Sequence, residues 1–368
     1  MTERRQQFAR LVAALVGIAT LQVFCGARTA WAQGAVRDQS GTLTTTADDQ
    51  AKKTWLEQRF GGSIAELTTY VGTGTFYTSG YRDPYISNAL FFRPQYNLGT
   101  KYKLALRARV YLEEEYTTPD TSNGRRFYPL DTIFYLNARN LYTGARSKVT
   151  FFGGGRVVVP TSYESRYAHL VTTLGLSAGA TRTFEFGRPD AQGKRWGLNL
   201  LYAQIADKAL RTSAVRGSFP GDTNGCRTTG PAGETGSAGG AESDRCGGPL
   251  NTSYSFAETG IASLTRGRVS LTVSLIVINE FKYSIDADRY TMLVAQSNQR
   301  PTGRADFTWG VTSLAYEITD KVSVSLGVAS YQPAMDSRQQ NLRFPFFDFN
   351  GTNADNFTQV SVGVSGTL

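Results

Sequence analysis

The chain offers few residues suited to enzymatic chemistry, and its histidine is the first to consider. His169 is the only histidine among 368 residues, so Ser-His nucleophilic catalysis would have to run through it. It lies in the segment RYAHLVTTLGL, on the opposite alternation from Leu170, Leu174 and Leu176. No His-Ser pair adjoins it. A lone histidine of this kind is more often one polar residue among many, so we expect no enzyme.

Cysteines and glycines add no cofactor site. Cys226 and Cys246 lie in a Gly-, Ser- and Thr-rich stretch, 208–252, and with no histidine nearby they do not suggest a metal site. In an oxidising compartment they predict a disulfide, and free thiols are the alternative. The run Gly153-Gly154-Gly155 could suggest a phosphate-binding loop, but three valines follow, which indicates a bend or a close approach within a strand. We therefore expect neither metal nor cofactor.

Charged residues with regular spacing carry the clearest chemical signal. In KYKLALRARVYLEEE, residues 101–115, the charges fall on one alternation and apolar residues on the other, with Glu114 out of phase. A β-strand sends successive side chains to opposite faces, so one face is charged and one is apolar. If such strands form a barrel that spans a membrane, charges facing the lipid would be costly, so the charged faces should line the lumen of the barrel. The candidates are Lys101, Lys103, Arg107, Arg109, Arg139, Arg156, Glu113, Asp131 and His169.

These side chains admit two interpretations. Arginines and lysines that ring a pore favour anions. Alternatively, the arginines pair with Glu and Asp residues and fill a nearly closed interior. Small barrels of about eight strands are filled by side chains, and barrels of roughly 16 to 18 strands leave an aqueous channel. For a barrel of intermediate size, a pore and a filled interior are both possible interpretations.

The first 32 residues are typical of a cleaved signal peptide. Arg4, Arg5 and Arg10 form a basic region, an apolar stretch follows, and Ala30-Trp31-Ala32 fits the cleavage pattern. A net charge of +9 could suggest nucleic acid, but an exported chain meets little of it, so we expect no nucleic-acid partner. Residues 33–61 then form a polar periplasmic segment, in which 47–60 could be a short helix.

Twelve strand candidates occupy residues 62–368. They run approximately over 63–77, 85–97, 101–115, 127–141, 148–159, 167–184, 196–207, 253–265, 268–283, 306–318, 321–333 and 357–368. Pro94 within the second predicts a strand end or a bulge. Short and long connections largely alternate, so the long ones gather at one end of the predicted structure.

Signal peptide, alternation and loop asymmetry together resemble the bacterial outer-membrane β-barrel class, over residues 62–368. The last strand ends Gly366-Thr367-Leu368, without the aromatic residue usual in that class. The resemblance implies an all-β, up-and-down antiparallel transmembrane barrel of about twelve strands in the bacterial outer membrane. It also implies contact with outer-membrane lipid and lipopolysaccharide, and with the barrel-assembly machinery during biogenesis.

The sequence therefore predicts a porin-like channel for passive diffusion of small hydrophilic solutes, anions among them. The disulfide-tied loop 208–252 would shape its external mouth. The first alternative is a structural or surface-binding barrel with a closed lumen and adhesin-like loops. The second is a membrane-embedded hydrolase dependent on His169.

Overall fold

The computed structural model describes residues 54–76, 84–99, 103–117, 126–189, 195–214, 250–284, 303–335, 341–347 and 358–368. The predicted signal peptide, residues 33–53, Lys101 and the cysteine pair lie outside the described residues. The elements in chain order are α3 (Trp55–Phe60), β1 (Ile64–Gly72), the 3-10 helix η2 (Thr73–Phe76), β2 (Ile86–Arg93), β3 (Gln95–Asn97), β4 (Leu104–Glu115), β5 (Arg126–Pro129), β6 (Thr132–Thr143), β7 (Thr150–Val159), α4 (Tyr163–Tyr167), β8 (Leu170–Phe186), β9 (Trp196–Arg211), β10 (Thr252–Arg266), β11 (Val269–Lys282), β12 (Arg304–Thr319), β13 (Val322–Pro333) and β14 (Thr358–Thr367).

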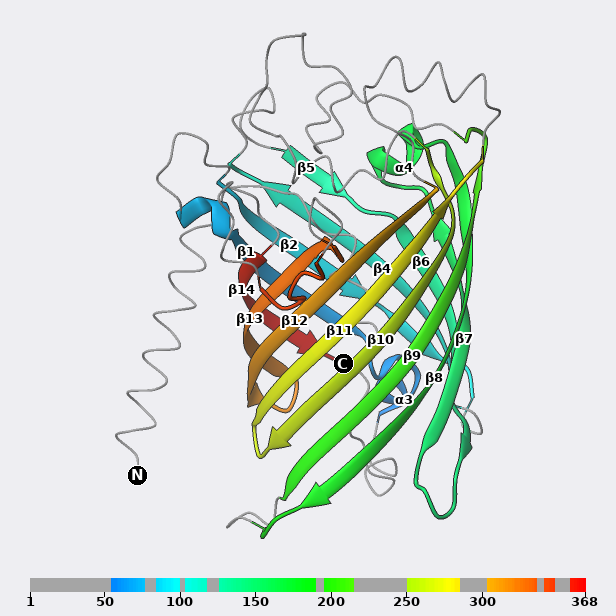
Figure 1. Ribbon diagram of the computed structural model, residues 1–368. Coiled ribbons are helices and arrows are strands. Elements are labelled where there is room, and N and C mark those ends of the chain that lie inside the picture. The colour runs from blue at the N-terminus through cyan, green and yellow to red at the C-terminus, as the bar shows by residue number, and fades with distance from the viewer. Residues whose placement is uncertain are drawn as a thin grey trace.

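These fourteen strands fill twelve positions of one closed antiparallel barrel (Figure 1). β2 and β3 share one position, because both pair with β4, and β5 and β6 share another. Each strand otherwise pairs with its neighbours in sequence, and β1 pairs with β14 to close the sheet. The prediction of an up-and-down barrel of twelve strands is confirmed.

Pro94 explains the break between β2 and β3. Proline has no backbone N–H and cannot donate to the ladder. Its carbonyl still accepts a hydrogen bond of 3.1 Å from Ala108 N in β4. The predicted interruption therefore lies at Pro94 itself. The glycine run 153–155 lies inside β7, also as predicted.

The two ends of the barrel differ in their connections. At one end, which we call the short-turn end, the strands join through residues 98–103, 144–149, 187–195, 267–268 and 320–321. The opposite, long-loop end carries α4 and the connections 212–251, 283–303 and 334–357. Figure 1 places α4 at the long-loop end and α3 towards the hairpin turns of the other end. Among the described residues, neither helix is long and apolar enough to span a membrane.

The outer face of the barrel is apolar and exposed. Leu106 and Leu136 face each other across β4 and β6 with 45% and 47% of their surface exposed. Leu314 and Leu326 do the same across β12 and β13. The other face of the same strands holds buried charges and hydroxyls. A closed barrel that is apolar outside and polar inside is the architecture of bacterial outer-membrane barrels, and the chain is a protein of that membrane.

Candidate functional site: the lumen wall

Strand β4 identifies the face that lines the lumen. Its side chains alternate strictly, and the buried set includes Arg107, Arg109, Glu113 and Glu115, each 5% exposed or less. The alternate set includes Leu106, which lies on the exposed outer face. Cross-strand pairing carries this alternation from strand to strand, because paired residues point to the same side. The charged face predicted for this segment is therefore the inner face of the sheet.

Five arginines gather on one side of the lumen, and we call them the basic band. Gln95, Arg107, Tyr135 and Arg156 lie in one register row across β3, β4, β6 and β7. Arg107 Nε donates to Gln95 Oε1 at 2.6 Å. The band consists of Arg93, Arg107, Arg109, Arg139 and Arg156, all from β2, β4, β6 and β7. Sequence analysis found four of these five and missed Arg93, because neither alternation of its strand is clean.

Arg139 lies at the short-turn end of the basic band. Its Nη2 donates to Asn97 Oδ1 at 3.0 Å, which joins β6 to β3 across β4. Asn97 in turn bonds the chain leading into β1, through its Nδ2 and the carbonyl of Gly61 at 3.1 Å. The band is thus held by amide side chains that orient the guanidinium groups.

Arg156 pairs with an acidic side chain, Asp207. Its Nε donates to Asp207 Oδ1 at 2.9 Å, and its Nη2 pairs with Oδ2 of the same carboxylate. Gly175 lies between them, paired in register with both residues. A Cβ at Gly175 would overlap the Asp207 carboxylate and lie 2.7 Å from Arg156 Cγ. The ion pair therefore crosses β8 because that position has no side chain.

Acidic side chains lie closer to the long-loop end. Glu113 Oε1 accepts a hydrogen bond of 2.8 Å from Tyr85 OH. Glu115 follows two residues later on the same face. Charges along β4 are therefore ordered, with arginines towards the middle and glutamates towards the long-loop end.

Asp131 has a different role from the predicted one. We expected it to line the lumen, but both of its oxygens anchor α4. Oδ1 accepts from Ser162 N at 2.9 Å, and Oδ2 accepts from Ser165 Oγ. Ser162 itself caps the helix by accepting from Ser165 N at 3.1 Å. The carboxylate is 3% exposed and serves to fix α4 at the long-loop end.

The prediction that His169 lies on a strand and lines the lumen is also wrong. It lies between α4 and β8 rather than within a strand, it is exposed, and its φ of 55° is left-handed. Its backbone N–H donates to Arg166 O, and its carbonyl accepts from Thr212 N, both at 3.0 Å. Its backbone thus ends α4 on one side and extends the β8–β9 pairing on the other. Lys103 lies in the connection before β4, where it is likewise exposed with a left-handed φ of 46°.

The wall facing the basic band carries hydroxyl groups beside an apolar cluster of Ile261, Ile276 and Trp309. In the barrel order β11 lies half-way round from β4. Ser263, Thr272 and Ser313 share one register row across β10, β11 and β12. Ser263 Oγ and Thr272 Oγ1 lie 3.0 Å apart, and Ser323 Oγ and Ser365 Oγ lie 2.7 Å apart. The alternating Ser and Thr of these strands were visible in the sequence, but only the register shows that they face arginines.

Helix α3 lies at the short-turn end of the barrel, beside β3. Thr54 caps it by accepting from Glu57 N, and the Glu57 side chain accepts from Thr54 N at 3.0 Å. This reciprocal capping box explains why a helix of six residues begins here. Arg59 Nη1 donates to Asn97 O at 3.4 Å, and Asn97 Nδ2 donates to Gln58 O at 2.9 Å. One side of α3 is therefore bound firmly to β3.

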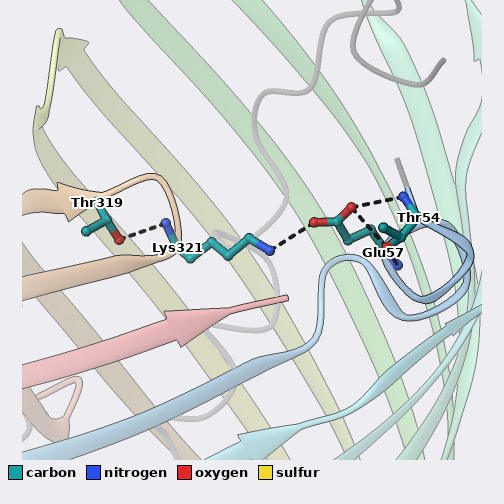
Figure 2. A network of polar contacts seen from close by, with 4 residues as sticks. All are labelled: Thr54, Glu57, Thr319 and Lys321. Atoms are coloured by element: carbon teal, nitrogen blue, oxygen red, sulfur yellow. Dashed lines mark hydrogen bonds and ion pairs between the residues drawn. The ribbon is translucent and has the colours of Figure 1, made fainter. Parts of the chain in front are cut away.

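On its other side α3 reaches the turn between β12 and β13. Lys321 Nζ pairs with Glu57 Oε1 at 2.9 Å, while Lys321 N donates to Thr319 Oγ1 at 3.2 Å (Figure 2). β1 and β14 lie between β3 and β13 in the barrel order, so this contact bridges their ends. The Lys321 hydrogen bond, followed by the bonds to Thr54, holds the pKa of Glu57 at about 2. We call this Glu57–Lys321 contact the latch.

No family model matches the chain, and no curated protein matches it. Among solved structures, it is similar to an outer membrane channel from Pseudomonas putida F1, with 11% identity, 89% of this chain and 100% of that chain covered, and a TM-score of 0.45. It is also similar to the NanC porin, with 10% identity, 83% of this chain and 100% of that chain covered, and a TM-score of 0.38. A third similar structure is the outer membrane channel DcaP of Acinetobacter baumannii, with 9% identity, 83% of this chain and 96% of that chain covered, and a TM-score of 0.29. Neither family nor function follows from likenesses of this size.

Proposed function

We propose that this outer-membrane barrel is a passive channel for small hydrophilic solutes and that its basic band favours anions. The observation that carries the proposal is the gathering of five arginines on neighbouring strands of one lumen wall, opposite hydroxyl groups. Guanidinium groups attract anions, and hydroxyl groups replace part of the hydration shell of a polar solute. Both effects act on a solute without changing its covalent bonds, so the role we propose is transport and not catalysis.

The order of charges along the wall supports a direction for the path. The long-loop end corresponds to the cell exterior and the short-turn end to the periplasm in barrels of this class. A solute entering from outside would pass Glu113 and Glu115, then the basic band, then α3. Lipid and lipopolysaccharide around the apolar belt, and the assembly machinery during biogenesis, are the partners we propose beside the solutes.

A closed lumen is the second candidate, and burial of the arginines favours it. Arg93 is fully buried, Arg107 and Arg109 are each 5% exposed, and Glu113 is 2% exposed. Side chains so enclosed pack against other protein groups on this wall. The protein would then be a structural barrel, or one that binds partners through the loops of its long-loop end.

Conductance across a planar bilayer separates the two candidates. We expect the purified barrel to conduct in KCl and to give a reversal potential of anion-selective sign in a salt gradient. Replacing both Arg107 and Arg109 with Gln should lower the anion preference several-fold. Arg146→Gln, at an exposed position in the β6–β7 turn, is the matched control. No conductance would exclude the channel, and cation selectivity would exclude the role of the basic band.

A further inference from the structure

The outer face of β8–β11 is hollowed by a shallow, open groove. Its volume is about 440 Å³, within the range of small-molecule sites. Leu200, Tyr202, Ala262 and Leu275 line it, and Gly260 forms its floor. These residues lie on the lipid-facing alternation, paired in register as Leu200 with Ala262 and Tyr202 with Gly260. No atom lies within 4 Å of where a Cβ of Gly260 would be, so the floor is open to the outside.

The end of the groove nearer the short turns carries a cation. Arg182 lies on the same outward face, paired with Leu200 across β8 and β9. Its guanidinium stacks over Phe184 at 4.2 Å from the ring centroid. Its Nε is buried and has no acceptor among the residues that the structure describes. An arginine here is close to the membrane interface, where a charge on the lipid face is tolerated.

The opposite end of the groove is bounded by protein. Two residues beyond Tyr202 and Gly260 the same outer face becomes polar, with Gln204 and Glu258 paired in register. On β12, the backbone of 345–346 lies where a Cβ of Gly310 would be, and Phe346 closes the groove wall. The groove is therefore apolar along its length and cationic only at its periplasmic end.

We infer that the groove is a binding site for one glycerophospholipid of the periplasmic leaflet. One acyl chain would lie over Gly260 between Leu200 and Leu275, and the phosphate would accept hydrogen bonds from Arg182. Apolar length and a single terminal cation match the two parts of this lipid, and the position of Arg182 near the β8–β9 turn sets its orientation. The site is independent of whether the lumen conducts.

Native mass spectrometry of the barrel extracted in mild detergent tests the site. We expect wild-type protein to retain one phospholipid, and both Arg182→Gln and Gly260→Leu to lose it. Arg266→Gln is the matched control for charge, because Arg266 is also outward-facing at the short-turn end and stacks on Trp196. Ala108→Leu is the control for added bulk on the opposite wall. Both controls should retain the lipid, and heat-modifiable migration in gels should show that every variant is folded.

Titration of the delipidated protein then assigns the phosphate. Phosphatidylglycerol should bind roughly tenfold more tightly than a diacylglycerol of the same chains, and Arg182→Gln should abolish that difference. The inference is overturned if wild-type protein retains no phospholipid, or if Arg182→Gln and Gly260→Leu retain it as the controls do. Retention of lipopolysaccharide alone, or a dimer that only Gly260→Leu disrupts, would overturn it as well.

Discussion

Lys321 Nζ lies 2.9 Å from Glu57 Oε1, although 264 positions separate the two residues in the chain. This contact ties α3 to the β12–β13 turn, and several hydrogen bonds tie the helix and its C-cap to β3. Both partners are partly exposed, so salt and solvent weaken the contact. The helix is consequently fixed on one side and held lightly on the other.

Loss of the latch should loosen α3 without unfolding the barrel. Lys321→Gln removes the ion pair and leaves the Thr54–Glu57 capping box intact. Hydrogen exchange of the 54–62 amides, followed by mass spectrometry, should speed up about two- to fivefold, as expected for an exposed pair. Lys148→Gln, in the β6–β7 turn, is the matched control and should leave the exchange unchanged. Equal exchange in both variants would show that the latch does not hold the helix.

The latch should persist over the whole physiological pH range. Glu57 has a pKa of about 2 in the folded protein, below its ordinary value of 4.5. A lowered pKa stabilises the folded contact fully above the unfolded value, and this contribution is lost as the pH falls through about 2. Carbon-13 NMR of the Glu57 carboxyl should show a midpoint near 2 that rises in Lys321→Gln. A wild-type midpoint at 4 or above would contradict the contact.

Adding a methyl group at Gly175 should destabilise the barrel. A Cβ there meets the Asp207 carboxylate and Arg156 Cγ, so the ion pair must move. Overpacking of this size costs about 1–3 kcal/mol in the free energy of unfolding, measurable by urea titration in lipid vesicles. Gly155→Ala on neighbouring β7 is the control, because a Cβ there finds contacts of 3.8 Å and longer. Equal free energies of unfolding for the two variants would mean that the ion pair moves aside at no measurable energetic cost.

Arg156 and Asp207 should be energetically coupled. Their side chains are 16% and 11% exposed, and the contact is bidentate. A double-mutant cycle with Arg156→Met and Asp207→Asn should give a coupling of about 1–3 kcal/mol in urea unfolding. Additive effects would show that each residue acts through other neighbours. The same variants should change the lumen charge in opposite directions, which conductance would detect if the lumen is open.

Alternation was sufficient to predict strands of a barrel, because it is clear on most of them. The strict pattern of 101–115 reappears as the buried and exposed faces of β4, and Pro94 marks the break that its missing N–H requires. Connection lengths then distinguished the two ends. These signals are local in the chain, so the sequence displays them directly.

Contacts between distant segments could not be predicted in the same way. Asp131 was assigned to the lumen by alternation, but it binds Ser162 and Ser165, which lie 31 and 34 residues later. His169 was assigned to a strand because the short helix before it carries no apolar periodicity. The outer groove depends on β8 to β11 together with Phe346. Each of these arrangements needs the register of several strands, which no single segment encodes.

The pairing of β1 with β14 has a mechanical consequence. It comprises nine residue pairs, from Ile64 with Thr367 to Gly72 with Gln359, and it joins the first and last strands, which no turn connects. Until the last strand arrives, β1 presents an unpaired edge, and this closing contact spans nearly the whole described chain. We expect a pulling force to open the wall along this seam first. The latch bridges the ends of these two strands, so α3 should raise the force needed to separate them.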